Sequence, residues 1–199
     1  GDATVNIALS FFDNKGRLIR QVDADSVQML FSQDDLGQTR IEALDVNRNG
    51  EIDFAGSDRI RRTRRTLQTA EGKGDIARTV VEVWDQADND SETTLSTTEE
   101  KTNGLERWIS EGGLTTHVQL AYPGNGRVET TVERPDQTTE SSTSLGGVTL
   151  DRKVSSPVEG TLVQITNEID GLDRVKTITD ELTGGSTLFS YYENDLTRT

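Results

Sequence analysis

Phe12-Asp13-Asn14-Lys15-Gly16-Arg17-Leu18 is the stretch that decides the fold of this chain. An aromatic residue and an aspartate lead into a short polar turn, Gly16 ends the turn, and an arginine opens a new apolar strand. A glycine at such a place supplies the positive φ that tight hairpin turns require. The stretch therefore predicts two antiparallel strands joined by a tight turn.

Similar turns recur along the chain. Gly37 follows Gly16 by 21 residues, and each of these glycines has a phenylalanine a few residues before it, Phe12 and Phe31. A spacing of about 20 residues suits a strand, a turn, a return strand and a connection. We expect the arginine after each turn to lay its stem over the preceding aromatic ring. Further copies are Asn103-Gly104-Leu105-Glu106-Arg107-Trp108-Ile109, which we align with Asp170-Gly171-Leu172-Asp173-Arg174-Val175-Lys176, and Gly124-Asn125-Gly126-Arg127-Val128.

Alternation of apolar and polar residues predicts strands and no helix. Residues 3–12, 76–84, 116–122 and 161–166 all read as strands, and turns rich in Gly, Asn and Asp separate them. The expected fold class is all-β: an extended ribbon of antiparallel β-hairpins. We interpret residues 1–199 as a single repeat region of roughly a dozen strands, with an insertion at 45–58.

Composition limits both the core and the partners. Apolar residues make up 31% of the chain, against about 45–50% in ordinary domains, so a thin sheet is expected. The net charge of −14 disfavours nucleic acid, and no apolar run is long enough for a membrane span. There is no cysteine, and hence no disulfide. No signal peptide is visible and the chain starts at Gly1, so we interpret it as a segment of a larger protein or assembly.

These turns resemble the tyrosine–aspartate (YD) repeats of the RHS family. Phe12-Asp13-Asn14-Lys15-Gly16-Arg17-Leu18 matches the pattern with Phe in place of Tyr, and residues 31–38 match with Gln38 at the arginine position. Ile169-Asp170-Gly171-Leu172-Asp173-Arg174-Val175, followed by Gly184 and Tyr191-Tyr192, is the best copy. The resemblance implies hairpins joined into one long ribbon that spirals into a shell. The autoproteolytic Asp-Pro motif of that family is absent.

Asp45-Val46-Asn47-Arg48-Asn49-Gly50-Glu51-Ile52-Asp53 has the spacing of a calcium-binding loop. Such loops present oxygen ligands at alternate positions and bend at a glycine. It resembles the loop of dockerins and EF-hands, although Gly56 stands where the last carboxylate ligand is expected. Ile52 should point inward as an anchor. The alternative is an ordinary Asn/Gly turn with solvated carboxylates. The predicted Ca²⁺ ligands are Asp45, Asn47, Asn49, Glu51 (through its carbonyl), Asp53 and, in place of the missing last ligand, Asp58.

Other clusters favour structural roles. Asp85-Gln86-Ala87-Asp88-Asn89-Asp90 reads as a solvated turn, and His117 as a surface or hairpin-packing residue. Without a recognisable triad or a distinct carboxylate pair, we predict no enzymatic activity. The basic run at 59–65 should pair with acidic strands, for example near 129–133, or else bind an anionic glycan. The aromatic residues that should cap the thin core, or alternatively stack on sugars, are Trp84, Trp108, Tyr122, Tyr191 and Tyr192.

The expected function is structural: a calcium-stabilised part of a secreted or cell-surface shell, stalk or filament. The expected partners are neighbouring repeats or identical subunits, joined through strand edges at 4–12 and 188–192. The alternative is an adhesin module that binds glycan or protein, and the third reading is a carbohydrate-active enzyme.

Overall fold

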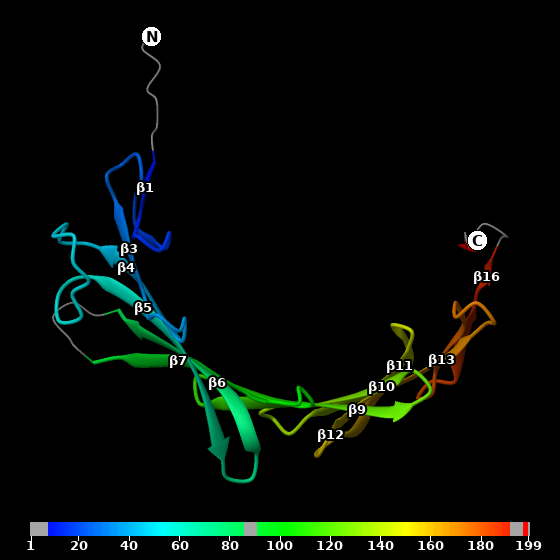
Figure 1. Cartoon of the computed structure of the whole chain (residues 1–199). Coiled ribbons are helices and arrows are strands. Elements are labelled where there is room, and N and C mark those ends of the chain that lie inside the picture. The colour runs from blue at the N-terminus through cyan, green and yellow to red at the C-terminus, as the bar shows by residue number, and fades with distance from the viewer. Residues whose placement is uncertain (1–7, 86–90, 192–196, 199) are drawn as a thin grey trace. The chain divides into compact units, whose positions relative to one another are not determined.

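The computed structural model describes residues 8–85, 91–191 and 197–198. Fifteen of its strands, β1 to β15, form one antiparallel sheet in which each strand lies beside its neighbours in the sequence (Figure 1). A separate two-stranded sheet joins β16 (Ser190–Tyr191) to β17 (Thr197–Arg198). The described residues contain no helix, so the prediction of an all-β chain built from successive hairpins is confirmed.

The chain divides into two compact units, Gly1–Thr102 with Ser110–Gly113, and Asn103–Ile109 with Leu114–Thr199. The strands of the first unit are β1 (Leu9–Phe12), β2 (Leu18–Val22), β3 (Gln28–Gln33), β4 (Thr39–Asp45), β5 (Arg59–Ala70), β6 (Gly74–Trp84) and β7 (Thr93–Lys101). Residues 3–7 of the strand expected at 3–12 lie outside the described residues, and the rest contains β1.

The second unit holds most of β8 and all later strands. These strands are β8 (Glu106–Glu111), β9 (Leu114–Gly124), β10 (Arg127–Glu133), β11 (Thr139–Leu145), β12 (Val148–Ser156), β13 (Gly160–Ile169), β14 (Val175–Asp180) and β15 (Gly185–Leu188), followed by β16 and β17.

A five-residue turn with one geometry joins several hairpins. In the turn 13–17, the amide of Asp13 donates to the carbonyl of Arg17 (2.9 Å) and the amide of Gly16 donates to the carbonyl of Asp13 (3.0 Å). The fourth residue has a positive φ, 76° at Gly16, as in a type I turn closed by a bulge. The same pair of backbone bonds closes the turns 23–27, 134–138 and 170–174.

One alignment made from the sequence is out of register. Gly104 has a φ of 71°, but Gly171 lies outside the left-handed region, and Asp173 occupies it instead with a φ of 59°. The turn 170–174 therefore corresponds to 13–17, with Asp173 in the place of Gly16, and not to the turn at Asn103-Gly104. Aspartate tolerates this conformation better than most residues. The position of Gly171 in the sequence therefore does not show which residue of this turn has the positive φ.

The expected stacking of each turn arginine on the preceding aromatic ring is wrong for Arg17. Its guanidinium faces Asp13, with 2.7 Å from Nε to Oδ2, while Phe12 remains 59% exposed. The carboxylate is the better partner because it offers a charge-assisted bond at short range. Arginine–aromatic contacts occur elsewhere: Arg20 covers Phe11 at 4.0 Å and Arg174 covers Tyr191 at 4.5 Å.

The hydrophobic core is thin, as the composition predicts. Its main cluster consists of Leu30, Ala43, Ile60 and Trp84 from four neighbouring strands of the first unit. Ile76 is the other fully buried apolar side chain among the described residues. Most apolar side chains elsewhere in the sheet are partly exposed. Stability must therefore come largely from strand pairing and cross-strand contacts between successive hairpins.

The basic run at 59–65 pairs with a different strand from the one proposed as an example. Arg62 and Arg64 bind Glu82 on β6, with 2.7 Å from Arg62 Nε and 2.6 Å from Arg64 Nη2 to its carboxylate. The acidic stretch 129–133 pairs with β9 and β11 instead. Because each strand joins its sequence neighbours, β5 can meet only β4 and β6.

Candidate functional site

The loop between β4 and β5, residues 46–58, lies over the main core. Ile52 and Phe54 of this loop pack against the core cluster. The ring of Phe54 meets the ring of Trp84 edge to face, with centroids 4.8 Å apart. The expected inward anchor at Ile52 is therefore present. Trp84, predicted to cap the core, is instead a buried member of the cluster itself. The loop supplies the cover that a single sheet lacks at this place.

Two buried carboxylates hold the ends of the loop. Asp45 is 3% exposed and Asp58 is 1% exposed. The Asp45 carboxylate accepts from the amides of Asn49 (3.2 Å) and Gly50 (2.9 Å). The Asp58 carboxylate accepts from the amides of Val46 (3.0 Å) and Asp53 (3.1 Å). Through these four hydrogen bonds the two aspartates hold the backbone of the loop in place.

The first half of the loop has the bends that the calcium-loop pattern predicts. The side-chain oxygen of Asn47 accepts from the amide of Asn49 at 3.0 Å, and that of Asn49 accepts from the amide of Glu51 at 2.8 Å. Gly50 has a φ of 77°, and Arg48 a φ of 60°. Together, these hydrogen bonds and φ values make residues 45–51 a series of tight turns, and this series carries Asp45, Asn47 and Asn49.

The second half of the loop is closed by the contact between Asp53 and Gly56. The amide of Gly56 donates to the carbonyl of Asp53 at 3.3 Å. A Cβ added to Gly56 would lie 2.2 Å from Oδ2 of Asp53, so a side chain at position 56 would push this carboxylate aside. Glu51 is exposed. Gly56 therefore leaves room for Asp53, while Asp58 is the carboxylate that returns to the start of the loop.

The balance of charge in the loop concerns the two buried aspartates, Asp45 and Asp58. Among the described residues, no arginine or lysine forms an ion pair with Asp45 or Asp58. A buried charge of one sign is costly unless an opposite charge or a metal compensates it. In the described ranges, no group of three or more His, Cys, Asp and Glu side chains is placed to hold a metal. Asparagine and backbone oxygens would therefore have to complete the ligand set, as hard cations allow.

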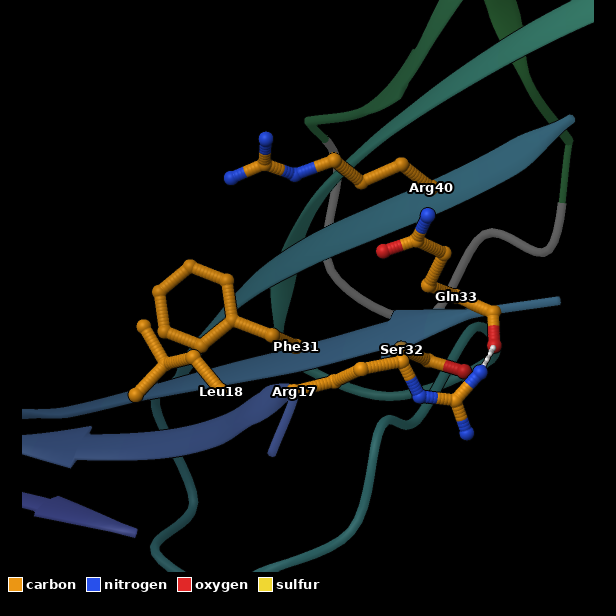
Figure 2. Close-up of a pocket in the computed structure, with 6 residues that line it drawn as sticks. All are labelled: Arg17, Leu18, Phe31, Ser32, Gln33 and Arg40. Carbon is orange, nitrogen blue, oxygen red and sulfur yellow. Dashed lines mark hydrogen bonds between the residues drawn. The ribbon is translucent and has the colours of Figure 1, made fainter. Parts of the chain in front are cut away.

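A shallow depression of about 220 Å³ lies beside the turns of the first unit (Figure 2). Arg17, Phe31 and Arg40 are among its lining residues. Arg17 crosses it to donate to the carbonyl of Gln33 at 3.3 Å and to the carboxylate of Asp35 at 3.2 Å. The arginine thereby ties the turn 13–17 to the turn 34–38, which is a structural role.

His117 and the remaining aromatic residues also have structural surroundings. The imidazole of His117 stacks on Trp108, with ring centroids 4.8 Å apart, and its Nε2 lies 3.5 Å from Glu106. The hydroxyl of Tyr191 donates to the carbonyl of Val175 at 2.5 Å. Tyr122 is 63% exposed and caps no core. Tyr192 and residues 86–90 of the expected acidic turn lie outside the described residues.

The buried Glu82 is the feature that the sequence reading missed. Its exposed fraction is 3%, and it lies between Arg62 and Arg64. Burial raises the pKa of this carboxyl, but the hydrogen bonds and charges of the two arginines outweigh burial, so the net pKa is lowered. The signal in the sequence is the alternation Arg62-Thr63-Arg64 opposite a single glutamate in the next strand.

A comparison with protein-family models finds no match, and a search of curated proteins finds no similar sequence. None of the described segments is a helix with the length and apolarity needed to cross a membrane.

Proposed function

We propose that this chain is a structural part of a secreted or cell-surface assembly, such as a shell, stalk or filament. In this proposal its hairpins form a strip like that of RHS/YD repeats, and calcium stiffens the strip. The observation that supports this proposal most is the single sheet of fifteen strands in sequence order, which has a very small buried core. Such a sheet gains stability from each added neighbour, which is the behaviour of repeat proteins.

The edge of the sheet supports assembly as the role. β15 is the last strand of the fifteen-stranded sheet, and all four of its residues are exposed. The amide of Phe189 donates to the carbonyl of Lys176 at 2.8 Å. Because amides alternate in direction along an antiparallel strand, the amide of Leu188 points away from β14. Among the described residues no strand pairs with the outer side of β15, and an edge of this kind can pair with another strand.

The loop 46–58 supports calcium as the stabilising ion. Asp45, Asn47, Asn49 and Asp58 would supply side-chain oxygens, Glu51 its carbonyl, and Asp53 a further oxygen directly or through water. The bound ion would neutralise the two buried aspartates and hold Ile52 and Phe54 on the core. The proposal assigns the chain no catalytic role.

Sedimentation velocity of the wild type and of a Leu188→Pro variant tests the assembly. Proline at 188 removes an outward amide and leaves the bonds to β14 in place. We expect the wild type to form larger species as its concentration rises and the variant to form fewer. Leu188→Ala, which keeps the amide, is the control and should behave like the wild type. A wild type that stays monomeric at all concentrations would contradict the proposal.

A further inference from the structure

The face of the first unit that carries the core continues beyond it into a polar trough. The trough has a volume of about 360 Å³ and runs across β5, β6 and β7. Its polar lining residues are Arg64, Thr66, Gln68, Arg78, Glu82, Thr94 and Thr97. Val80 is the one apolar residue that lines it. A surface with this lining suits a polar ligand better than an apolar one.

The strand register places these side chains together. Thr66 faces Arg78 across β5 and β6, and Val80 faces Thr97 across β6 and β7. Directly opposed residues of antiparallel strands lie on the same face of the sheet. From Arg64 to Gln68 the trough extends about 13 Å along the strand, and three strands span about 10 Å across.

The trough is positive, although the whole chain carries a net charge of −14. Four cations, from Arg62, Arg64, Arg78 and Lys73, stand in and around it against two carboxylates, from Glu82 and Glu99. The carboxylate of Glu82 is shared by two arginines and that of Glu99 by Lys73 and Arg78. An excess of positive charge therefore remains on this face.

Arg78 has a donor that the protein does not satisfy. Its Nε is buried and makes no hydrogen bond to any described residue, because the carboxylate of Glu99 lies 3.7 Å away. Its side chain as a whole is still 41% exposed. Buried donors are normally paired. Because Nε itself is buried, an anionic group in the trough would meet the exposed part of the Arg78 side chain rather than this atom.

We infer that this trough binds a short stretch of acidic polysaccharide, two or three sugar rings long. Arg64 and Arg78 would contact the acid groups, while Thr66, Thr94, Thr97 and Gln68 would exchange hydrogen bonds with ring hydroxyls. Single-stranded nucleic acid needs aromatic stacking platforms, and no residue lining the trough is aromatic. A protein partner needs about 800 Å² of surface on each side with apolar anchors, and the trough offers Val80 alone.

Titration of the ¹⁵N-labelled chain with trigalacturonate, followed by amide NMR shifts, tests this inference. We expect shifts confined to β5–β7 and a dissociation constant on the order of 1 mM or tighter. Maltotriose, a neutral sugar of the same length, should cause no comparable shifts. A sulfated heparin tetrasaccharide, run in parallel, shows whether sulfate serves as well as carboxylate; binding of either acidic sugar supports the inference.

Matched variants give the decisive comparison. Arg78→Gln should weaken binding about tenfold, since a charge-assisted bond is lost. Thr97→Val removes a hydroxyl but keeps the shape of the side chain, and it should weaken binding several-fold. Arg65→Gln and Thr98→Val make the same chemical changes on the opposite face and should leave binding within about twofold. Absence of wild-type binding to either acidic sugar, equal loss in the opposite-face variants, or equal binding of maltotriose would overturn the inference. The titration reads binding from the amides of β5–β7, whereas sedimentation reads assembly, so a failure of one proposal can be told from a failure of the other.

Discussion

The carboxylate of Asp170 accepts a hydrogen bond from Nε of Arg174 at 2.8 Å, across the five-residue turn between β13 and β14. Asp13 and Arg17 make the same contact at 2.7 Å in the turn between β1 and β2. In both turns Oδ1 of the aspartate also accepts the amide of the arginine. The turn therefore combines one backbone geometry with an ion pair between its first and fifth residues, the aspartate and the arginine. We call this ion pair the clasp.

The first prediction concerns the acid titration of this clasp. The side-chain hydrogen bond from Arg174 is the main reason that the pKa of Asp170 is lowered to about 2. Because the folded-state pKa is depressed, the clasp stabilises the hairpin fully above the unfolded value of about 3.9. That contribution is lost as the pH falls from about 4 through about 2.

Carboxyl ¹³C NMR measures this effect directly. In the wild type Asp170 should titrate near the lowered pKa, and in Arg174→Gln its pKa should rise toward the ordinary range. Lys176→Gln, which removes a positive charge two residues away, is the control and should have little effect. An unchanged Asp170 titration in Arg174→Gln would show that the clasp does not set this pKa.

The second prediction concerns calcium and Asp58. If the ion binds only the folded chain, a concentration 100 times the dissociation constant adds about 2.7 kcal/mol of stability. For a chain of this size that raises the unfolding midpoint by about 5–10 °C. Asp58→Asn should reduce the calcium-dependent rise strongly, because a buried carboxylate facing the loop is lost.

Thermal unfolding with calcium and with chelator gives the readout. Asp25→Asn, in an exposed turn outside the loop, should retain the full rise. Identical midpoints with calcium and with chelator in the wild type would rule out a stabilising ion in this loop.

The third prediction concerns Phe54, which covers the core from the loop. Phe54→Ala removes the ring that packs on Trp84 and on the cluster beneath it. Because Phe54 is only partly buried, we expect a loss of about 2 kcal/mol, below the cost for a fully buried ring. Urea unfolding checks this value. Leu36→Ala, at a residue that is 80% exposed, should be nearly neutral, and equal losses in both variants would show that the loop does not support the core.

The fourth prediction concerns Glu82. Glu82→Gln removes the carboxylate that both Arg62 and Arg64 bind. We expect a loss of about 2 kcal/mol near neutral pH, less than for a wholly buried pair because the arginines reach solvent. The lowered pKa means that the wild-type advantage is present above about 4.3, the unfolded value, and is lost as the pH falls through the lower folded value.

Urea unfolding of the two proteins at neutral and at acid pH measures this advantage. Glu100→Gln, in an exposed position on the opposite face of the neighbouring strand, is the matched control and should be nearly neutral. If the difference in the free energy of unfolding between the wild type and Glu82→Gln does not shrink in acid, the ionised Glu82 carboxylate is not the source of the stability.

The sequence was sufficient to predict the hairpin architecture because its signals are local. Alternation defined the strands, and the Asp-x-x-Gly-Arg stretch at 13–17 defined a real turn. The inward position of Ile52 followed from the spacing of the loop. In a sheet whose strands pair with their sequence neighbours, local signals also determine the topology.

Contacts between side chains were harder to predict. The left-handed residue of the turn 170–174 is Asp173 rather than Gly171. The turn requires a positive φ at its fourth residue, and that residue need not be a glycine. Glu82 could not be recognised as buried before the register of β5 and β6 was known. The trough on β5–β7 also depends on that register, since it gathers residues from three strands.

Electron microscopy of the purified chain across a range of concentrations, in the presence of calcium, tests the central claim most directly. If successive hairpins serve as a strip that joins further copies edge to edge, the micrographs should show strings or fibres that lengthen as the concentration rises. Uniform single particles, unchanged from the lowest to the highest concentration, would contradict the account.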